Sequence, residues 1–310
     1  MFSGSAHPGL AVEICAQLGV QLRPAQLRRF ANDCLEVQLQ SNCRERDVFV
    51  IQPLSAPVQE HLVELLLMLD AARGASAARV TAVIPYYPYA RSDKKDKPRI
   101  SIAGRLVADL LVTAGANRVL TMTLHAPQVH GFFSVPVDHL HALREIAGHF
   151  RGQNLAGAVV VSPDLGNAKP ASMLARMLGL PVAAGAKERH DDFSVTISSI
   201  IGDVTGRDVI VLDEEVARGT TITELLARLR ERGARSVRIA CTHGLFRDGA
   251  LQRITAQPEV TEVVCCDTVP VPDAERDPKL RVISLAPALA EAIRRIHEGE
   301  SVSALFEVSG

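Results

Sequence analysis

Apolar runs of strand length alternate along this chain with segments of helical periodicity, and this order constrains the fold more than any other feature. The clearest stretch, residues 47–126, contains DVFVIQ, PVQEHLVELLLMLDAARG, RVTAVIPYY, SIAGRLVADLLVTAG and RVLTMTLHA. Strands that are separated by helices pair in parallel, and helices then cover both faces of their sheet. The order therefore predicts an α/β protein with mainly parallel sheets flanked by helices.

Glycine follows several of the predicted helices, where a left-handed residue commonly ends a helix. Gly74, Gly115, Gly179 and Gly233 each come directly after a periodic segment. Because glycine adopts a positive φ without steric cost, we expect these four residues to be left-handed caps.

The size and charge of the chain exclude several classes of protein. Its 310 residues are 47% hydrophobic and 22% charged, which is enough for two domains with separate cores. The formal net charge of −1 offers no polybasic face for nucleic acid. The most apolar helix is interrupted by Glu64, and the N-terminus lacks the pattern of a secretion signal. We therefore expect a cytoplasmic protein that binds neither nucleic acid nor membrane.

The six cysteines contain no CxxC pair, and Cys265 and Cys266 lie inside a strand-like run. This usage is typical of reduced, structural thiols rather than of a metal site or a disulfide framework.

A short similarity between the two halves of the chain indicates a duplication. The segments at 114–126 and 232–244 share a Gly-Ala pair and a histidine ten positions after the glycine, at His125 and His243. Chance similarity between two helix-to-strand turns is the alternative. A duplication predicts two similar domains, at 1–145 and 146–310, which join near HALREIAGHFRGQNLAG without a low-complexity linker.

The segment TMTLHAPQVHGFFSVPVD, at 121–138, indicates a ligand site at a strand end. His125 is expected to be the last residue of a buried strand that includes Val119, Leu120, Met122 and Leu124. Ligands of open α/β sheets bind beyond the carboxyl ends of strands, and an imidazole there can ligate a cation or contact a phosphate. A histidine that only caps the strand is the alternative.

A second predicted strand, at 207–212, leads into acidic residues and a Gly-Thr-Thr loop. Asp213 and Glu214 follow the strand, and a helix with apolar residues at 222, 225, 226 and 229 begins after Gly219. Free N–H groups and the dipole at a helix N-terminus favour an anion, so phosphate is the expected ligand. Thr220 and Thr221 add hydroxyl donors, while the acids could bind a sugar diol or an ion. Capping threonines beside solvated acids are the alternative.

This loop and five other segments, taken in order, resemble the ribose-phosphate diphosphokinases, also called phosphoribosyl pyrophosphate synthetases. The other segments are IPYYPYARSDKKDKPR (84–99), LHAPQVHGFFSVPVD (124–138), SPDLGNAK (162–169), KER (187–189) and ESVSALF (300–306). The resemblance runs from Phe2 to Phe306. It implies two tandem type I phosphoribosyltransferase-like domains, and an enzyme that uses Mg²⁺ to transfer the β,γ-diphosphoryl group of ATP to the anomeric hydroxyl of ribose 5-phosphate.

The resemblance also implies roles for individual residues. Lys187 and Arg189 would form a catalytic lid that brings two cations onto the migrating phosphorus. The ribose 5-phosphate would be bound by the loop and its acids: Asp213, Glu214, Ala217, Arg218, Gly219, Thr220 and Thr221. The diphosphoryl group would be received by another strand-to-helix turn: Asp164, Leu165, Gly166, Asn167, Ala168 and Lys169.

ATP would be bound mainly by the first half of the chain. The residues implied are Phe30, Asn32, Cys34, Arg91, Ser92, Lys94 and His125. Phe30 and the Arg91 guanidinium would hold the base, while His125 and Asp164 would contact Mg²⁺–ATP. The N-terminal domain would thus carry the ATP site and the oligomer contacts, and the C-terminal domain the sugar site, with the last ~20 residues packing on the N-terminal domain. The family resemblance implies a dimer-based homo-oligomer, of which a hexamer is one form.

The chain departs from the family's usual residues at several of these positions. Cys34 stands where a glutamate would accept a hydrogen bond from adenine, and a thiol is a weak acceptor. Thr123 replaces an aspartate, and Arg218 adds a cation for phosphate. Thr220 replaces a glycine and places a Cβ where a positive φ is expected. A looser choice of nucleotide is one hypothesis, and a catalytically weak homologue that associates with or regulates active subunits is the alternative function.

Overall fold

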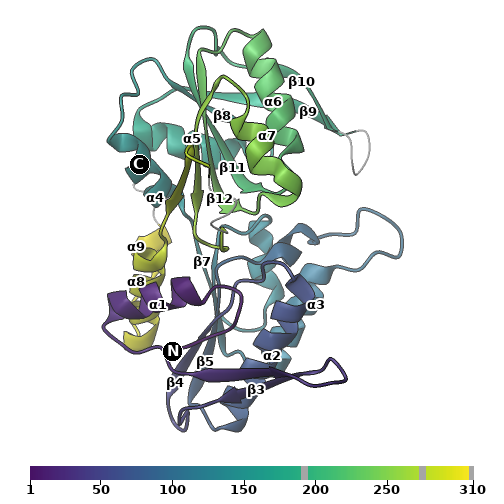
Figure 1. Ribbon diagram of the computed structural model, residues 1–310, viewed down its shortest axis with the longest axis vertical. Coiled ribbons are helices and arrows are strands. Elements are labelled where there is room, and N and C mark those ends of the chain that lie inside the picture. The colour runs from purple at the N-terminus through teal and green to yellow at the C-terminus, as the bar shows by residue number, and fades with distance from the viewer. Residues whose placement is uncertain (190–194, 272–276, 307–310) are drawn as a thin grey trace. The chain divides into compact units, whose positions relative to one another are not determined.

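The computed structural model describes residues 1–189, 195–271 and 277–306, which form two compact α/β units (Figure 1). Among the described residues, the first unit comprises Met1–His141, Thr268–Pro270 and Leu285–Phe306, and the second comprises Ala142–Asp267 and Val271–Ser284. Each unit is built on its own sheet. The predicted α/β class with mainly parallel sheets is confirmed.

The sheet of the first unit has five parallel strands in the order β1-β4-β5-β6-β7. These strands are β1 (Phe2–Ser3), β4 (Asp47–Ile51), β5 (Arg79–Ile84), β6 (Arg118–Met122) and β7 (Val137–Leu140). A separate antiparallel hairpin is formed by β2 (Ala25–Arg29) and β3 (Leu35–Leu39).

Helices cover both faces of this sheet. Figure 1 shows α1 (Pro8–Leu18) beside α8 (Ala286–Glu298) on one side, and α2 (Val58–Gly74) beside α3 (Ala103–Ala114) on the other. Strand β4 is buried on both faces, as a parallel strand should be. The short helices are η1 (Pro88–Arg91), η2 (Pro127–Phe132) and α9 (Ser303–Phe306).

The sheet of the second unit has the order β10-β9-β8-β11-β12-β13-β14. The strands are β8 (Val159–Ser162), β9 (Val182–Arg189), β10 (Val195–Ile201), β11 (Asp208–Val216), β12 (Ser236–Gly244), β13 (Val260–Cys266) and β14 (Leu280–Ile283). Only β9 and β10 are antiparallel to each other, and they form a hairpin at one edge.

Two pairs of helices flank the second sheet (Figure 1). They are α4 (Leu143–Arg151) with α5 (Ala168–Leu178), and α6 (Thr220–Glu231) with α7 (Ala250–Thr255), which follows the short η3 (Arg247–Gly249). The apolar stripe predicted on α6 is buried as expected: Ile222, Leu225, Leu226 and Leu229. Among the described helices, none is long and apolar enough to cross a membrane.

The expectation of glycine caps is confirmed at Gly179, which ends α5 with φ 68°, and Gly233 likewise has a left-handed φ of 73°. Gly115 has a positive φ of 129°, outside the usual left-handed region. The expectation was wrong at Gly74, which is the last residue of α2. The left-handed residue there is Ser76, with φ 62°.

The two histidines that suggested the duplication occupy different places in the two units. His243 lies inside β12 and is only 3% exposed, whereas His125 is exposed and follows the end of β6. The two histidines thus differ in exposure and in whether they lie within a strand.

All six cysteines are free, as predicted. Five of them are buried and Cys34 is exposed, so Cys34 is not one of the structural thiols.

Candidate active site

The Gly-Thr-Thr loop forms the N-terminus of α6, as the sequence predicted. Gly219 is the cap residue, with φ 72° and ψ 8°, and Thr220 is the first residue of the helix. The Gly219 carbonyl accepts from both the backbone N–H and the hydroxyl of Thr223, each at 2.9 Å. Glycine has no side chain to cap the first turn of α6. The backbone N–H groups of that turn can therefore donate to an anion.

Gly219 could not be replaced by another residue without strain. A Cβ at this position would lie 3.0 Å from Ile254 Cδ1 and 3.3 Å from Ala250 Cβ, both on α7. The expectation that Thr220 needs a positive φ was wrong, because that conformation falls on Gly219 and Thr220 is already helical. The chain thus keeps its one glycine where the geometry of the loop requires it.

The acidic residues before the loop lie within β11 and not after it. The sequence predicted that this strand ends at Leu212, but it continues to Val216, where it pairs with Gly244 of β12. Asp213 and Glu214 are half-buried, and the Glu214 N–H donates to Asp213 Oδ1 at 2.8 Å.

Arg218 lies on the surface beside this loop. Its Nε is 3.1 Å from Asp248 Oδ2, and both side chains are more than 60% exposed, at 63% and 64%. An exposed ion pair contributes little, so the guanidinium can exchange Asp248 for a phosphate at small cost. The neighbouring Ala217 carbonyl accepts from the Arg247 N–H at 2.9 Å, which fixes the backbone of the loop.

The turn after β8 is a second strand-to-helix connection in the same unit. The Asn167 N–H donates to Asp164 Oδ1 at 3.0 Å, and α5 begins at Ala168. The Asn167 side-chain amide donates to the carbonyl of Leu212 in β11 at 2.8 Å. This bond joins the turn after β8 to the strand that leads into the α6 loop, a role for Asn167 that the sequence did not indicate.

The outer part of the turn after β8 is open to solvent. Leu165, Gly166 and Lys169 are exposed, and Leu165 retains 63% of its accessible surface. An exposed turn at the carboxyl end of a parallel strand is where an α/β protein binds its ligand.

Lys187 and Arg189 belong to β9, at the end of the β9–β10 hairpin. They pair with Ile197 and Val195 respectively. Of the predicted lid segment, residues 190–194 lie outside the described part of the chain.

Gly185 places this hairpin close to the turn after β8. A Cβ on Gly185 would lie 2.6 Å from the Pro163 carbonyl oxygen, so only glycine permits the approach. Strand β9 also pairs with β8 up to Ala184, which is opposite Ser162. Lys187 therefore follows three residues after this pairing, beside the turn that carries Asp164.

In the first unit, the segment that carries His125 leaves the sheet earlier than predicted. Strand β6 ends at Met122, because the backbone turns at Thr123 with a φ of 41°. The Thr123 N–H donates to the Leu140 carbonyl, and the Leu124 N–H donates to His139 Nε2, both at 2.8 Å. His125 is exposed just beyond this turn. The prediction that His125 lies at the carboxyl end of the sheet is confirmed, but the prediction that it is the last residue of the strand was wrong.

The predicted residues Phe30, Asn32 and Cys34 all lie in the turn between β2 and β3. Phe30 is 49% exposed, and Asn32 Oδ1 accepts from the Cys34 N–H at 3.3 Å. The Phe30 N–H donates to the Cys34 carbonyl at 2.9 Å, which closes the turn. The structure thus gathers these three residues on one exposed hairpin tip.

Arg91 ends η1, and Ser92 and Lys94 follow it in the loop that leads to α3. Ser92 Oγ donates to the Ser101 carbonyl at 3.1 Å and accepts from the Ala103 N–H at 3.0 Å. Ser92 therefore holds the ends of this loop together at the start of α3, while Arg91 and Lys94 are exposed.

Among the described residues, no three His, Cys, Asp or Glu side chains gather closely enough to hold a metal ion by themselves. Mg²⁺ is bound in another way, since it keeps several waters and uses one or two carboxylates together with phosphate oxygens. Asp164, Asp213 and Glu214 supply carboxylates that are only half-buried. These residues fit Mg²⁺ that arrives with a phosphate ligand.

Two parallel-sheet units with glycine-containing turns at the carboxyl ends of their strands define the class: an α/β protein suited to phosphate-bearing ligands. The profile of the N-terminal domain of ribose phosphate pyrophosphokinase matches residues 1–115, and that of the phosphoribosyl synthetase-associated domain matches residues 194–307. The chain belongs to the ribose-phosphate pyrophosphokinase family.

Individual relatives agree over the whole length. The chain is 71% identical to a Streptomyces coelicolor relative over 99% of this chain and 97% of that protein. It is 50% identical to the ribose-phosphate pyrophosphokinase of Deinococcus radiodurans, with the same coverage. The crystal structure of phosphoribosylpyrophosphate synthetase from Mycobacterium smegmatis superposes with a TM-score of 0.90 at 41% identity, covering 96% of this chain and 98% of that one. The predicted family, and with it an enzyme of this kind, is confirmed.

Proposed function

We propose that this protein transfers the β,γ-diphosphoryl group of ATP to the anomeric hydroxyl of ribose 5-phosphate, giving 5-phosphoribosyl 1-diphosphate and AMP. Membership of the family supports the reaction. The observation that carries the proposal is the N-terminus of α6, where Gly219 leaves the first turn without a side-chain cap beside half-buried acids. Such a site suits a sugar that carries a phosphate.

The second unit binds ribose 5-phosphate in this proposal. The sugar phosphate lies on the turn from Ala217 to Thr221, where N–H groups, two threonine hydroxyls and Arg218 donate to its oxygens. Asp213 and Glu214 bind the ribose hydroxyls. The sugar is thereby fixed at both ends, which orients its anomeric hydroxyl for attack.

The turn from Asp164 to Lys169 receives the migrating diphosphoryl group. Its support is the Asn167–Leu212 hydrogen bond, which joins this turn to the strand that carries the sugar-binding acids. Lys187 and Arg189, on the adjacent hairpin strand, bring two cations to the phosphorus in the transition state. Phosphoryl transfer depends mostly on such positioning and neutralisation.

The first unit binds ATP in this proposal. The hairpin tip with Phe30, Asn32 and Cys34 holds the base together with Arg91, while the Ser92 and Lys94 region and His125 contact the nucleotide phosphates. Mg²⁺ is the proposed cofactor, which would neutralise the phosphate oxygens, and His125 and Asp164 are the residues that would contact it. The exposure of Phe30 supports a role in contact with a ligand or a neighbouring subunit.

A dimer-based homo-oligomer in the cytoplasm is part of the proposal, as is the division of labour between an N-terminal ATP domain and a C-terminal sugar domain. The alternative of a catalytically weak regulatory homologue has no support among the relatives reported above.

Sugar-dependent release of AMP tests the proposed reaction. Purified protein with Mg²⁺ and ATP should release AMP when ribose 5-phosphate is added, and a coupled assay follows the release. The same assay without the sugar phosphate measures any background hydrolysis. Folded protein that releases no AMP above this background would overturn the proposal in favour of the regulatory homologue.

The substitution Cys34→Glu should sharpen the preference for ATP. A carboxylate restores the strong acceptor for the adenine amino group, so the ratio of kcat/KM for ATP to that for GTP should rise roughly tenfold. Cys34→Ala is the matched control, because it adds no acceptor and should leave the ratio unchanged. Identical nucleotide rankings for Cys34→Glu and wild type would show that Cys34 lies outside the base pocket.

A further inference from the structure

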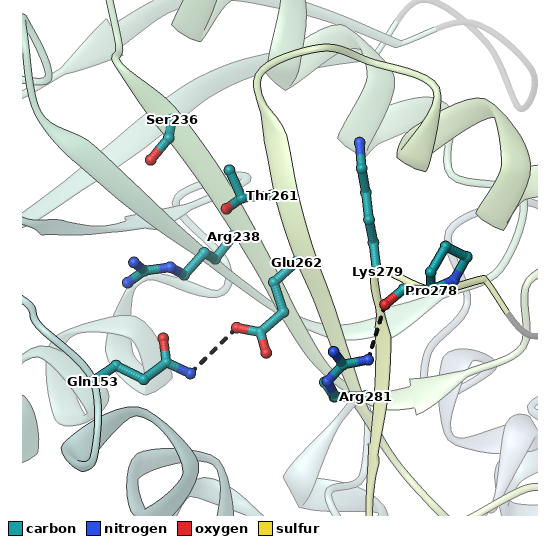
Figure 2. A pocket seen from close by; sticks show the side chains of 8 residues that line it. All are labelled: Gln153, Ser236, Arg238, Thr261, Glu262, Pro278, Lys279 and Arg281. Atoms are coloured by element: carbon teal, nitrogen blue, oxygen red, sulfur yellow. Dashed lines mark hydrogen bonds between the residues drawn. The ribbon is translucent and has the colours of Figure 1, made fainter.

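The second unit contains a polar pocket of about 360 Å³ where β12, β13 and β14 begin (Figure 2). Three of its lining residues are cations, Arg238, Lys279 and Arg281. Figure 2 shows their head groups pointing apart, with the Glu262 carboxylate between the two arginines. A ligand site needs polar groups that converge, so these side chains are not arranged around a ligand. Hydrogen-bond donors do converge at the opposite end of β12, on the loop that precedes α6.

The segment after β12 holds the backbone of this loop. The carbonyl of Val216 accepts from the N–H groups of Leu245 and Phe246, both at 3.0 Å. The next carbonyl, that of Ala217, accepts from the Arg247 N–H at 2.9 Å. Two consecutive carbonyls at the start of the loop thus point toward the segment that follows β12.

The side chain of Arg253, on α7, holds the third carbonyl. Its Nη2 donates to the Arg218 carbonyl at 2.8 Å, and its Nη1 donates to the Asp248 carbonyl. Because the N–H groups of a guanidinium form a rigid fork, this one side chain joins the α6 loop to the turn before α7. The Arg218–Asp248 ion pair described above links the same two residues through their side chains.

The segment that supplies these donors has a strained backbone that packing fixes. Phe246 has a φ of 43° and Asp248 a φ of 57°, and a positive φ is rare for a residue as bulky as phenylalanine. The Phe246 ring is 3% exposed, and a Cβ on Gly244 would lie 2.6 Å from it. Strain of this kind persists only where the surroundings determine the conformation, and it is concentrated at functional sites.

The three carbonyls determine where the N–H groups of the loop point. In a trans peptide the C=O and the following N–H point in opposite directions, so the N–H groups of residues 217–219 point away from the segment after β12. Gly219 restricts the peptides beside it less than any other residue would. The peptide between Arg218 and Gly219 therefore depends on Arg253 for its direction.

We propose that Arg253 is a positioning residue for ribose 5-phosphate. By holding the Arg218 carbonyl, it keeps the N–H of Gly219 directed at the phosphate of the sugar. A loop that is already in its binding conformation avoids the cost of ordering when the ligand arrives. The inference rests on the proposed binding of ribose 5-phosphate at the α6 loop, and Arg253 acts there through the backbone without touching the substrate.

Titration of the full-length protein with ribose 5-phosphate in a calorimeter tests this role. Arg253→Gln should weaken binding by about tenfold or more, because the Arg218 carbonyl loses its charged donor. Arg253→Lys should also weaken binding, since it keeps the charge but a single ammonium does not reproduce the fork between two carbonyls. The control is Arg232→Gln, which removes the same charge from an exposed residue at the end of α6 and should bind the sugar like wild type.

Steady-state kinetics separates a positioning role from a general loss of structure. Both Arg253 variants should raise the KM for ribose 5-phosphate, while kcat at saturating sugar and the KM for ATP stay close to wild type. The reason is that saturating substrate selects the binding conformation of the loop even when that conformation is less populated. A purely structural role would instead lower kcat together with the midpoint of urea unfolding. Arg253 is exposed, so its replacement leaves the core of the unit intact.

Two results would overturn the inference while the proposed function stands. One is a wild-type affinity for ribose 5-phosphate in both Arg253 variants. The other is a wild-type affinity in Arg253→Lys alone, which would show that charge suffices and the fork does not matter. A wild-type protein that binds no ribose 5-phosphate would refute the proposed sugar site itself, and the inference with it. Should Arg253→Gln fail to fold, Arg253→Lys carries the test.

Discussion

Replacing Lys187 with alanine is expected to lower turnover by about 10²–10³-fold or more, while the affinity for ribose 5-phosphate stays nearly unchanged. The reason is the position of this residue on the β9–β10 hairpin. Its strand is held against the turn that carries Asp164 by the close approach of Gly185 to Pro163, and Lys187 is distant in sequence from the sugar loop. Loss of a charge that acts in the transition state lowers kcat rather than binding.

Single-turnover experiments measure the rate of the chemical step, and a direct titration with ribose 5-phosphate measures the affinity for the sugar. Lys95→Ala serves as the control, because it removes the same charge from an exposed residue of the first unit. A Lys187→Ala enzyme with wild-type turnover would remove Lys187 from the catalytic groups. A variant that loses sugar affinity instead would place this residue in the binding site for ribose 5-phosphate.

The substitution Gly219→Ala should affect both stability and sugar binding. A residue with a Cβ at φ 72° costs about 1–3 kcal/mol, and the added methyl group would also press on Ile254 at 3.0 Å. Relief of that contact moves the start of α6, so the N–H groups no longer converge on one phosphate. We expect a loss of ribose 5-phosphate affinity of roughly tenfold or more.

Gly179→Ala is the matched control for this experiment. Gly179 has nearly the same conformation, with φ 68°, but a Cβ there would meet nothing within 4 Å. It should therefore show the backbone cost in urea unfolding without a change in the affinity for ribose 5-phosphate. If Gly219→Ala also keeps wild-type affinity, the N-terminus of α6 is not the phosphate site.

The α6 loop could be predicted from sequence because all of its determinants are local. These determinants are the acids of the preceding strand, the glycine and the helical spacing of the apolar residues after Thr221. They all lie within residues 213–229. The structure places them as that pattern requires. The hairpin tip with Phe30 and Cys34 likewise depends on neighbours in sequence.

The strand ends could not be predicted, because they depend on partners far along the chain. Strand β11 continues through its acids since β12 offers backbone groups as far as Gly244. Strand β6 stops at Met122 because the backbone turns at Thr123, and the Leu124 N–H then bonds to the side chain of His139 on the neighbouring strand β7. The role of Gly185 was missed for the same reason, since it is defined by the close approach of Pro163, a residue that is distant in sequence.

Both ends of the chain are needed to complete the first unit. Helix α8 packs beside α1, and the Arg79 Nη2 donates to the Ile296 carbonyl at 2.9 Å, while His297 Nδ1 lies 2.9 Å from Asp47 Oδ2. During synthesis the ribosome therefore releases the whole second unit before the first can bury the apolar side of α1. A fragment that stops after β7 is expected to expose that surface and aggregate, whereas most of the second unit is one continuous stretch of sequence and can fold as it emerges.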